Sequence, residues 1–463
     1  MATNDLPNGF TGFGHRRAGF VSAADAIRAR ENKTQAQAAA REQRADEPEA
    51  ASAPRLRPLG AMLADNSDRP PLRPFDEAEL EAIDQRDRRW AWLEIDLGAI
   101  RHNVVQTRRR LKRGTRLLAV VKADAYGHGA VRVAETALNS GADYLAVATV
   151  PEGIELRRAG ITAPILVLAQ PPATSIPLLL AYDIYPAVYD AQFAIQYGEV
   201  ADSHGMKAPF HLAVNTGMNR IGVRYDEVAS LLTQIAFHRA LVLEGVFTHF
   251  ATADCPETLD FDIQSKRFAE AVDSIRALGI DPGIVHCANS AAIFRYPQVH
   301  YDMVRLGISL YGYYACPEMR SLVELKPAMS VHARITDTRL VPTGEGVSYG
   351  LHYRSAGSVK ICTVPLGYAD GLRRGLSGNT YFIVDGKLCR QVGNICMDQC
   401  MFEVDLRSYG THRRIDPQVG DEVIIAGQKD GLEVSIDELA DKLDTIQHEI
   451  TIGFAQRLPR IYV

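Results

Sequence analysis

The sequence predicts an α/β protein in which a (β/α)8 barrel of the TIM type is followed by a mainly β domain. Eight short apolar runs lie between residues 116 and 310, and segments with three-to-four-residue apolar spacing separate them. Strands that alternate with helices pair in parallel, and eight such units favour a closed barrel over a doubly wound sheet. No G-x-G-x-x-G motif follows a run, which weakens the dinucleotide-binding form of that alternative.

The first 88 residues differ from the rest. Ser22–Pro54 consists largely of Ala, Glu, Arg and Gln with few branched or aromatic side chains, and Arg55–Pro74 is rich in Pro and Asp. Such a composition cannot bury an apolar face, so we expect residues 1–88 to form a disordered or loosely docked extension. One surface helix over Asp76–Arg88 is expected to lead into the folded part.

The barrel is expected over residues 89–326, with a strand in each apolar run. The runs are Leu117–Lys122, Tyr144–Ala148, Ile165–Leu168, Ile184–Val188, Phe210–Val214, Leu243–His249, Ile284–Cys287 and Met303–Leu310. Active sites of such barrels lie at the carboxyl ends of the strands. Several polar residues follow the runs at that end, and together they indicate a site: Lys122, Asn215, His249, His286, Asn289 and Ser290.

Residues 327–463 are expected to form the β domain. The runs there are short, alternate in polarity and are separated by Gly, Asp and Asn turns. They are Ser330–Ile335, Lys360–Val364, Tyr381–Val384, Met401–Val404 and Val423–Ala426. A helical segment from Ile436 to about Gln447 precedes the C-terminal tail.

Composition excludes several classes of protein. A net charge of −5 gives no reason to expect nucleic acid or an anionic membrane as a partner, and no run reaches the length of a membrane span. Seven cysteines, an odd number, are typical of free thiols in a reducing compartment, so we expect a cytoplasmic protein. No histidine completes a zinc pattern with Cys389, Cys396 and Cys400, so no metal site is expected.

The first strand run ends in Lys122, within the string Ala119-Val-Val-Lys-Ala-Asp-Ala-Tyr-Gly-His-Gly129. A lysine there is costly unless it faces a polar cavity or is used covalently, and desolvation lowers its pKa and makes it a nucleophile or base. A surface lysine before a glycine turn is the alternative. The string resembles the pyridoxal 5'-phosphate (PLP) segment of alanine racemases, a barrel class of PLP enzymes. The resemblance implies that Lys122 binds PLP covalently and that Tyr126 contacts its phosphate.

The resemblance covers Trp90 to Val463 and implies further site residues. The segment Thr216–Gly222 resembles the one whose arginine binds the phenolic oxygen of the cofactor and the substrate carboxylate, here Arg220. Residues expected at the cofactor, beside Lys122 and Tyr126, are His249, Asn289, Ser290, Arg305, Gly307, Ile308 and Tyr462.

Arg305 matches the arginine that donates to the pyridine nitrogen. Many PLP enzymes place a carboxylate there, which keeps that nitrogen protonated and makes the ring a deep electron sink. An arginine is protonated itself, leaves the nitrogen unprotonated and disfavours transamination, as a racemase requires. A structural salt bridge is the alternative for Arg305.

Racemisation removes a proton from one face of Cα and returns one to the other, so two bases on opposite faces are the simpler arrangement. By resemblance they are Lys122 and Tyr349, with Tyr349 supplied by the β domain of the opposite subunit. This implies a homodimer with shared active sites. Met397 and Tyr368 match residues that bind the substrate carboxylate and line the entrance. The implied reaction interconverts L- and D-alanine and supplies D-alanine for the cell wall, and a catabolic role is left open.

The chain departs from the family at Ala213 and Asn215, where many members carry lysine and aspartate. Arg220 must therefore be held in another way. The same departures resemble the broad-spectrum racemases of the superfamily, so a serine or broader-specificity racemase remains the alternative. Related decarboxylases would place a glutamate at Arg305, and single-barrel PLP-binding proteins lack the β domain. We expect alanine to be preferred over serine by at least about tenfold.

Overall fold

The computed structural model describes residues 76–406 and 415–463. The extension expected over residues 1–88 lies outside the described residues up to position 75. Asp76–Arg88 contains two short helices, α2 (Glu77–Glu81) and α3 (Gln85–Arg88), where a single helix was predicted. Asp84 has a non-helical backbone and its carboxylate accepts a hydrogen bond from Arg86 N at 2.7 Å, so it caps a new helix and interrupts the first.

Eight parallel strands form the barrel, and each overlaps one of the predicted runs. Their order is β10-β2-β3-β4-β5-β6-β8-β9. Asp302 N donates to Val285 O at 3.0 Å and Arg305 N to Ala288 O at 2.9 Å, which links β9 to β10 and nearly closes the ring. The strands are β2 (Arg116–Val120), β3 (Tyr144–Val147), β4 (Ile165–Val167), β5 (Ile184–Val188), β6 (Ala208–Asn215), β8 (Leu241–Phe247), β9 (Ile284–His286) and β10 (Met303–Leu306). A short strand, β7 (Val223–Arg224), pairs with the end of β6.

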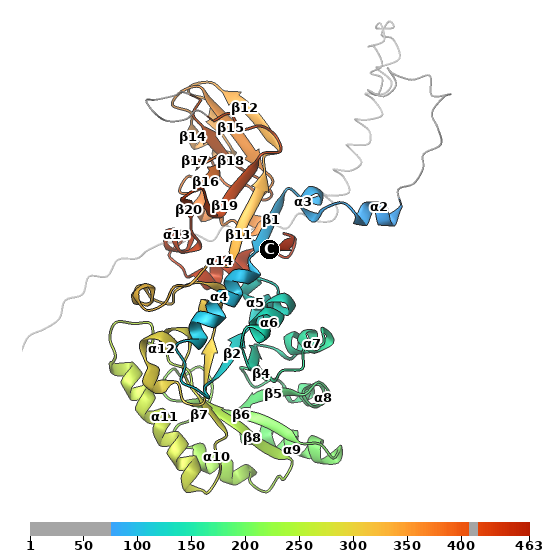
Figure 1. Ribbon diagram of the computed structural model, residues 1–463, viewed down its shortest axis with the longest axis vertical. Coiled ribbons are helices and arrows are strands. Elements are labelled where there is room, and N and C mark those ends of the chain that lie inside the picture. The colour runs from blue at the N-terminus through green and yellow to red at the C-terminus, as the bar shows by residue number, and fades with distance from the viewer. Residues whose placement is uncertain (1–75, 407–414) are drawn as a thin grey trace, which may run out of the picture. The chain divides into compact units, whose positions relative to one another are not determined.

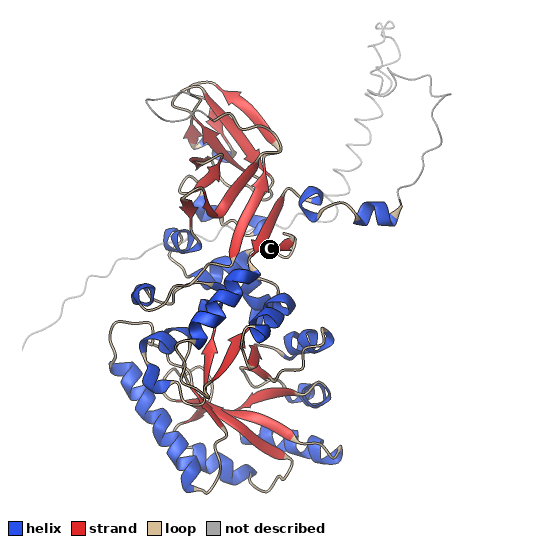
Figure 2. Ribbon diagram, viewed as in Figure 1, coloured by secondary structure: helices blue, strands red, loops and turns tan. Residues whose placement is uncertain are grey.

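Helices form an outer layer around these strands (Figure 2). Their apolar faces pack on the strands; in α11, for example, Phe261, Phe268 and Ile275 are buried at seven-residue intervals. The helices are α4 (Leu97–Arg108), α6 (Ala130–Asn139), α7 (Val150–Arg158), α8 (Ile176–Ala181), α9 (Ala191–Ser203), α10 (Val228–Ile235), α11 (Leu259–Ala277) and α12 (Ser290–Arg295). The short segment α5 (Lys122–Gly127) follows β2 and has a left-handed backbone.

A second, mixed sheet forms the C-terminal domain (Figure 1). All five runs predicted there are strands, and the order is β12-β15-β18-β17-β16-β19-β11-β1-β21, with β20 beside β19. The strands are β11 (Met329–Arg334), β12 (Asp337–Val341), β15 (Val359–Val364), β16 (Tyr381–Val384), β17 (Lys387–Val392), β18 (Cys400–Val404), β19 (Glu422–Lys429), β20 (Leu432–Val434) and β21 (Arg460–Tyr462). A two-stranded ribbon pairs β13 (Gly346–Val347) with β14 (Tyr353–Arg354).

The strand β1 (Ala91–Ile95) lies in this second sheet, although it falls in the range expected for the barrel. It is antiparallel to β11 and parallel to β21, with Leu93 opposite Val331 and Arg460. The C-terminal sheet therefore takes a strand from the segment before the barrel, which ties the two domains together. The exact domain boundaries stay a prediction.

The helical segment expected over Ile436–Gln447 is two helices, α13 (Ile436–Lys442) and α14 (Gln447–Gly453). Asp444, with a φ of 52°, separates them. No helix in the part of the chain that the structure describes is long and apolar enough to cross a membrane.

Candidate active site

A cavity of about 640 Å³ lies at the carboxyl ends of the barrel strands. Nine residues predicted for the site line it, and they come from the ends of five different strands and the loops that follow them. They are Lys122, Tyr126, Arg220, His249, Asn289, Ser290, Arg305, Gly307 and Ile308. The structure therefore brings these nine residues together, whereas His286, also expected at this end of the barrel, does not line the cavity and is buried against Arg305.

Lys122 lies two residues after the end of β2 and begins α5. Burial lowers the pKa of its ammonium group, and the Arg220 guanidinium lowers it further, whereas the Glu152 carboxylate opposes both. The carboxylate of Glu152 also accepts a hydrogen bond from Ala123 N at 2.7 Å and so anchors the turn that carries Lys122. A lysine with a lowered pKa is available as a nucleophile or a base.

The turn after Lys122 has an unusual backbone. Four consecutive residues, Ala123 to Tyr126, have φ between 52° and 54°, in the left-handed region. This conformation costs roughly 1–2 kcal/mol per non-glycine residue, so the surroundings must hold it. Asp124 Oδ1 accepts a hydrogen bond from Ala130 N at 2.8 Å, and His128 Nδ1 lies 3.0 Å from both Ala125 O and Tyr126 O. The strain lies next to the candidate nucleophile, as in many active sites.

Arg305 is buried on β10 at the floor of the cavity. Its Nη2 donates to Thr248 O at 2.7 Å and to His249 Nδ1 at 3.1 Å, so the other nitrogen of His249 carries the proton. Burial and the charges of Arg305 and Arg220 lower the pKa of His249 to about 3, which keeps this imidazole neutral. Burial also lowers the pKa of Arg305, to about 10, and the guanidinium remains charged at neutral pH.

Ser290, Gly307 and Tyr126 form a small polar cradle at the cavity wall. Gly307 N donates to Ser290 Oγ at 3.0 Å, which leaves the Ser290 hydroxyl proton free to donate. A Cβ atom added at Gly307 would lie 3.4 Å from Tyr126 Oη and 3.5 Å from Ser290 Oγ, so glycine leaves open space between two hydroxyl groups. Asn289 caps α12 through its Oδ1, which accepts from Ala292 N at 3.0 Å, besides lining the cavity. This donor set suits a phosphate group.

Arg220 lines the cavity but makes no hydrogen bond or ion pair with other described residues. Asn215 acts on the loop that carries it rather than on the guanidinium. The Asn215 side-chain oxygen accepts from Gly217 N and Asn219 N, both at 3.1 Å, and its Nδ2 donates to Asn219 Oδ1 at 3.0 Å. Ala213 is buried beneath the cavity. Among the described residues, no side chain braces the Arg220 guanidinium in place of the missing lysine, and Asn215 shapes only the loop that carries it.

Tyr349, Tyr368 and Met397 do not line this cavity. They are 74%, 41% and 54% exposed, values that are high for side chains of this size. Their segments are nevertheless joined: Asn394 Nδ2 donates to Tyr349 O at 2.7 Å, Tyr368 N to Cys396 O at 3.0 Å and Ala369 N to Met397 O at 2.9 Å. The β domain thus presents all three on one set of connected loops.

Tyr462 also lies outside the lining of the cavity. A Cβ atom added at Gly129 would lie only 1.9 Å from Tyr462 Oη, so this hydroxyl packs against the backbone behind the Lys122 turn. Arg132 lies over the Tyr462 ring at 5.0 Å. The structure gives Tyr462 a contact with the turn, and its role at a phosphate stays a prediction.

Sequence reasoning missed His448, which reaches the cavity from α14 together with Ile446. Its ring lies 5.5 Å from that of Tyr126, and burial with the charge of Lys122 lowers its pKa to about 4. His448 Nδ1 is buried without a hydrogen-bond partner among the described residues. No local signal could have placed it, because α14 meets the Lys122 turn across more than 300 residues of sequence.

Comparison with known proteins points to one family. The profile "Alanine racemase, N-terminal domain" matches residues 95–315, and "Alanine racemase, C-terminal domain" matches residues 328–462. The chain is 43% identical to the alanine racemase of Synechocystis sp. over 81% of its own length and 100% of that protein. It is similar in structure to the alanine racemase of Clostridium difficile 630, with 38% identity and a TM-score of 0.76 over 81% and 96% of the two chains. For that of Bacillus anthracis with bound L-Ala-P the identity is 37% and the TM-score 0.75, over 81% and 95%.

Proposed function

Because the chain belongs to the alanine racemase family, we propose that it interconverts L-alanine and D-alanine with PLP as cofactor. The observation that carries the proposal is the convergence of Lys122, Arg305 and the Ser290–Gly307 cradle on one cavity. Each supplies what the cofactor needs: an amine for its aldehyde, a donor for its ring nitrogen and donors for its phosphate. When bound, PLP supplies an electron-withdrawing ring that stabilises negative charge at the substrate Cα.

The residues of this chain fit the cofactor in chemistry as well as in position. Lys122 has a lowered pKa, which favours the unprotonated amine that can add to a carbonyl. Arg305 is buried, charged and without an acidic partner among the described residues, so its charge is available to a ring nitrogen. Tyr126 and Ser290 present hydroxyl groups on either side of Gly307, where a phosphate is expected.

We propose that two bases carry the proton across Cα. Lys122 Nζ would take or return the proton on one face, and Tyr349 Oη of a second copy of the chain would act on the other. Arg220 would hold the substrate carboxylate with its guanidinium, assisted by Met397 N of the second copy, while Tyr368 would narrow the entrance. The neutral His249, with its proton on Nε2, would donate within the cavity.

The exposure of Tyr349, Tyr368 and Met397 supports a homodimer with shared active sites. Such large side chains on connected loops are typical of a surface that a second copy covers. Mixing tests this. Lys122→Ala and Tyr349→Phe subunits, each inactive alone, should regain about a quarter of wild-type activity, since half of the dimers are mixed and each has one intact site. No recovery after subunit exchange would contradict shared sites.

The first test of the function is to measure both enantiomers by chiral chromatography. Protein with PLP should convert L-alanine to D-alanine, and Lys122→Ala should lower the rate by at least about a thousandfold. Borohydride reduction should fix PLP on Lys122 of the wild type, as peptide mass spectrometry would show. Absence of both product and attachment would refute the proposal.

Specificity separates alanine racemase from the alternative, a serine or broader-specificity racemase. We expect kcat/KM for L-alanine to exceed that for L-serine by at least about tenfold. The reason is that the bulky side chains of Tyr349, Tyr368 and Met397, assigned here to the substrate site, would leave room for little more than a methyl group. Comparable rates on lysine or arginine would favour the broader alternative.

The seven cysteines are free thiols, which supports a reducing, cytoplasmic location. We propose that the enzyme supplies D-alanine for the cell wall. Its gene should then restore growth without added D-alanine to a bacterium that lacks its own racemases, whereas failure of an active enzyme to do so would favour another role.

A further inference from the structure

Arg305 is a buried cation whose partners are all neutral. Besides Thr248 O and His249 Nδ1, it donates through Nη1 to His286 Nδ1 and His286 O, both at 3.1 Å, and through Nη2 to Cys287 O at 3.2 Å. No aspartate or glutamate pairs with it among the described residues, whereas buried arginines usually have such a partner. The position of the guanidinium therefore depends on imidazole and carbonyl acceptors alone.

The hydrogen bonds define the tautomers of two histidines. Arginine can only donate, so His286 Nδ1 must accept and its proton must be on Nε2. His286 Nε2 lies 2.9 Å from His211 Nδ1, which must then accept in turn. The proton of His211 is therefore on Nε2. Arg305 therefore donates to His286, and His286 donates in turn to His211.

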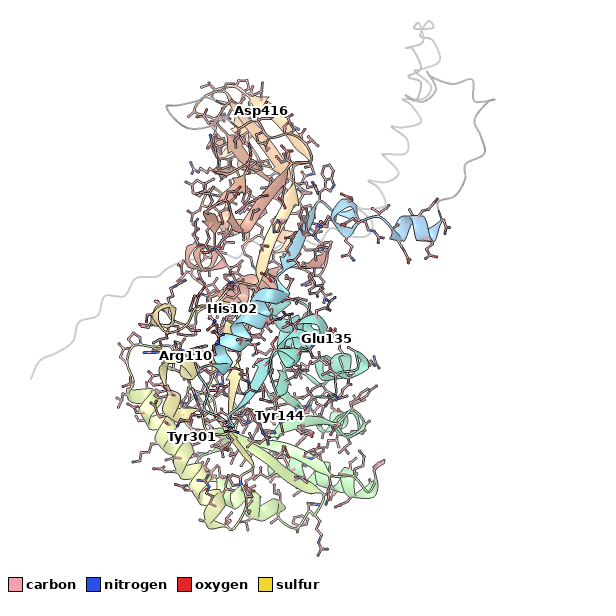
Figure 3. All side chains as sticks on the ribbon, in the orientation of Figure 1. His102, Arg110, Glu135, Tyr144, Tyr301 and Asp416 are labelled. Atoms are coloured by element: carbon pink, nitrogen blue, oxygen red, sulfur yellow. The ribbon has the colours of Figure 1, made fainter. Side chains whose placement is uncertain are left out.

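This series of hydrogen bonds ends inside the barrel at an N–H group that has no acceptor among the described residues. His211 is fully buried, and its Nε2 has no hydrogen-bond partner among the described residues. Tyr144, labelled in Figure 3, meets the His211 ring edge-on at 6.5 Å, but its hydroxyl donates to Glu244 Oε1 at 3.1 Å instead. Burial and the charge of Arg305 lower the pKa of His211 to about 3, so this imidazole does not gain a proton.

An unpaired buried N–H is costly, and a residue that merely filled space would be apolar. What His211 supplies is the acceptor for His286 Nε2–H. Without this acceptor, neither tautomer of His286 would form all its hydrogen bonds. A proton on Nε2 would have no acceptor, and a proton on Nδ1 would face the N–H groups of Arg305.

We propose that His211 is a positioning residue, which holds His286 in the one tautomer that accepts from Arg305 and thereby aims the guanidinium at the ring nitrogen of the cofactor. The proposal rests on the proposed function for its effect on the reaction. The tautomers themselves do not depend on it, so the two can fail separately.

Neutron diffraction of the deuterated protein tests the tautomers directly. Deuterons on Nε2 of both His286 and His211, and none on His286 Nδ1, are the expected result. A deuteron on His286 Nδ1, or two on either ring, would overturn the proposal whatever the enzyme does.

Two substitutions test the effect on the reaction. In His211→Asn the amide oxygen replaces Nδ1 as acceptor, whereas His211→Leu fills similar space without one. The readout is the amount of pyruvate formed per D-alanine formed. When the ring nitrogen is not held unprotonated, L-alanine can transfer its amino group to the pyridoxal cofactor, which gives pyruvate and the pyridoxamine form.

The Leu variant should raise this ratio by about fivefold or more, a factor that corresponds to the loss of one ordinary hydrogen bond. The Asn variant should stay within about twofold of the wild type. Equal ratios in the two variants would overturn the positioning role. Should the Leu variant not fold, the Asn variant and the wild-type neutron structure still decide, because a large rise with Asn contradicts the proposal.

Discussion

Arg457 Nε donates to the Oδ1 atom of Asp370 at 2.7 Å, and Asp370 is fully buried. The same oxygen also accepts from Arg89, and the second oxygen accepts from Gly367 N at 2.9 Å. Arg457 continues to Asp398 Oδ1 at 2.7 Å. One buried carboxylate thus joins the segment before β1, the segment before β21 and the two loops that present Tyr368 and Met397.

Replacing Asp370 by Asn should destabilise the protein strongly. The amide keeps the shape but removes the charge, which leaves two arginines without their buried partner, and such losses cost about 3–5 kcal/mol. Urea denaturation of Asp370→Asn measures this cost. The matched control is Asp226→Asn, which breaks an exposed pair with Arg224 and should cost no more than about 1 kcal/mol. Equal costs would show that the buried carboxylate has no special role.

Gly307→Ala should weaken cofactor binding. Gly307 has φ −97° and ψ −110°, a combination that residues with a Cβ rarely adopt. The new methyl group itself would meet only ordinary contacts in the protein. It would, however, occupy the space between Tyr126 Oη and Ser290 Oγ that a phosphate needs. We expect PLP to bind at least about tenfold more weakly. The thermal midpoint of the cofactor-free variant measures the separate cost of the backbone conformation. Fluorescence titration measures the affinity, and an unchanged Kd would remove Gly307 from the cradle.

Much of the fold was predictable because the barrel strands are buried on both faces. Such strands are continuous apolar runs, and all eight were found. Strands β12 and β17 were missed because exposed residues such as Arg339 and Arg390 interrupt them. The position of β1 could not be predicted, since its pairing of Ala91 with Ala333 joins residues far apart in sequence.

Residues of the candidate site could be predicted where they lie within a local sequence motif, as Lys122 and Arg305 do. The left-handed backbone after Lys122 could not be predicted, because Ala123 to Tyr126 are residues that disfavour it and only tertiary contacts hold it there. His448 and the direction of the hydrogen bonds from Arg305 were also beyond the sequence. Both depend on which side chains meet across the barrel.

Tyr349→Phe should lose activity without losing stability. Its side chain is 74% exposed, so removing one hydroxyl group leaves the packing of this chain unchanged. Loss of a general base typically lowers the rate by about 100-fold or more. We therefore expect kcat for L-alanine to fall by that factor with an unchanged thermal midpoint. A kcat close to that of the wild type would remove Tyr349 from the reaction.

His128 should make the protein lose stability in mild acid. It is fully buried, its ring lies 4.5 Å from that of Tyr311, and Nδ1–H donates to Ala125 O and Tyr126 O in the left-handed turn. Burial lowers its pKa from 6.5 to about 4, against the opposing effect of the two carbonyl groups. The neutral form is the folded form, so between these pKa values only the unfolded chain gains the proton.

The stability from His128 is therefore complete above about pH 7 and is lost as the pH falls from 6.5 towards 4. Between pH 7 and pH 5 the loss from this one group is about 2 kcal/mol. In His128→Asn an amide N–H can donate to the same carbonyl groups but does not titrate. Urea denaturation of both proteins at the two pH values, at one protein concentration, should show a loss smaller by about that amount in the variant. Other buried histidines contribute equally to both proteins, so parallel losses would mean that His128 is protonated in the folded state.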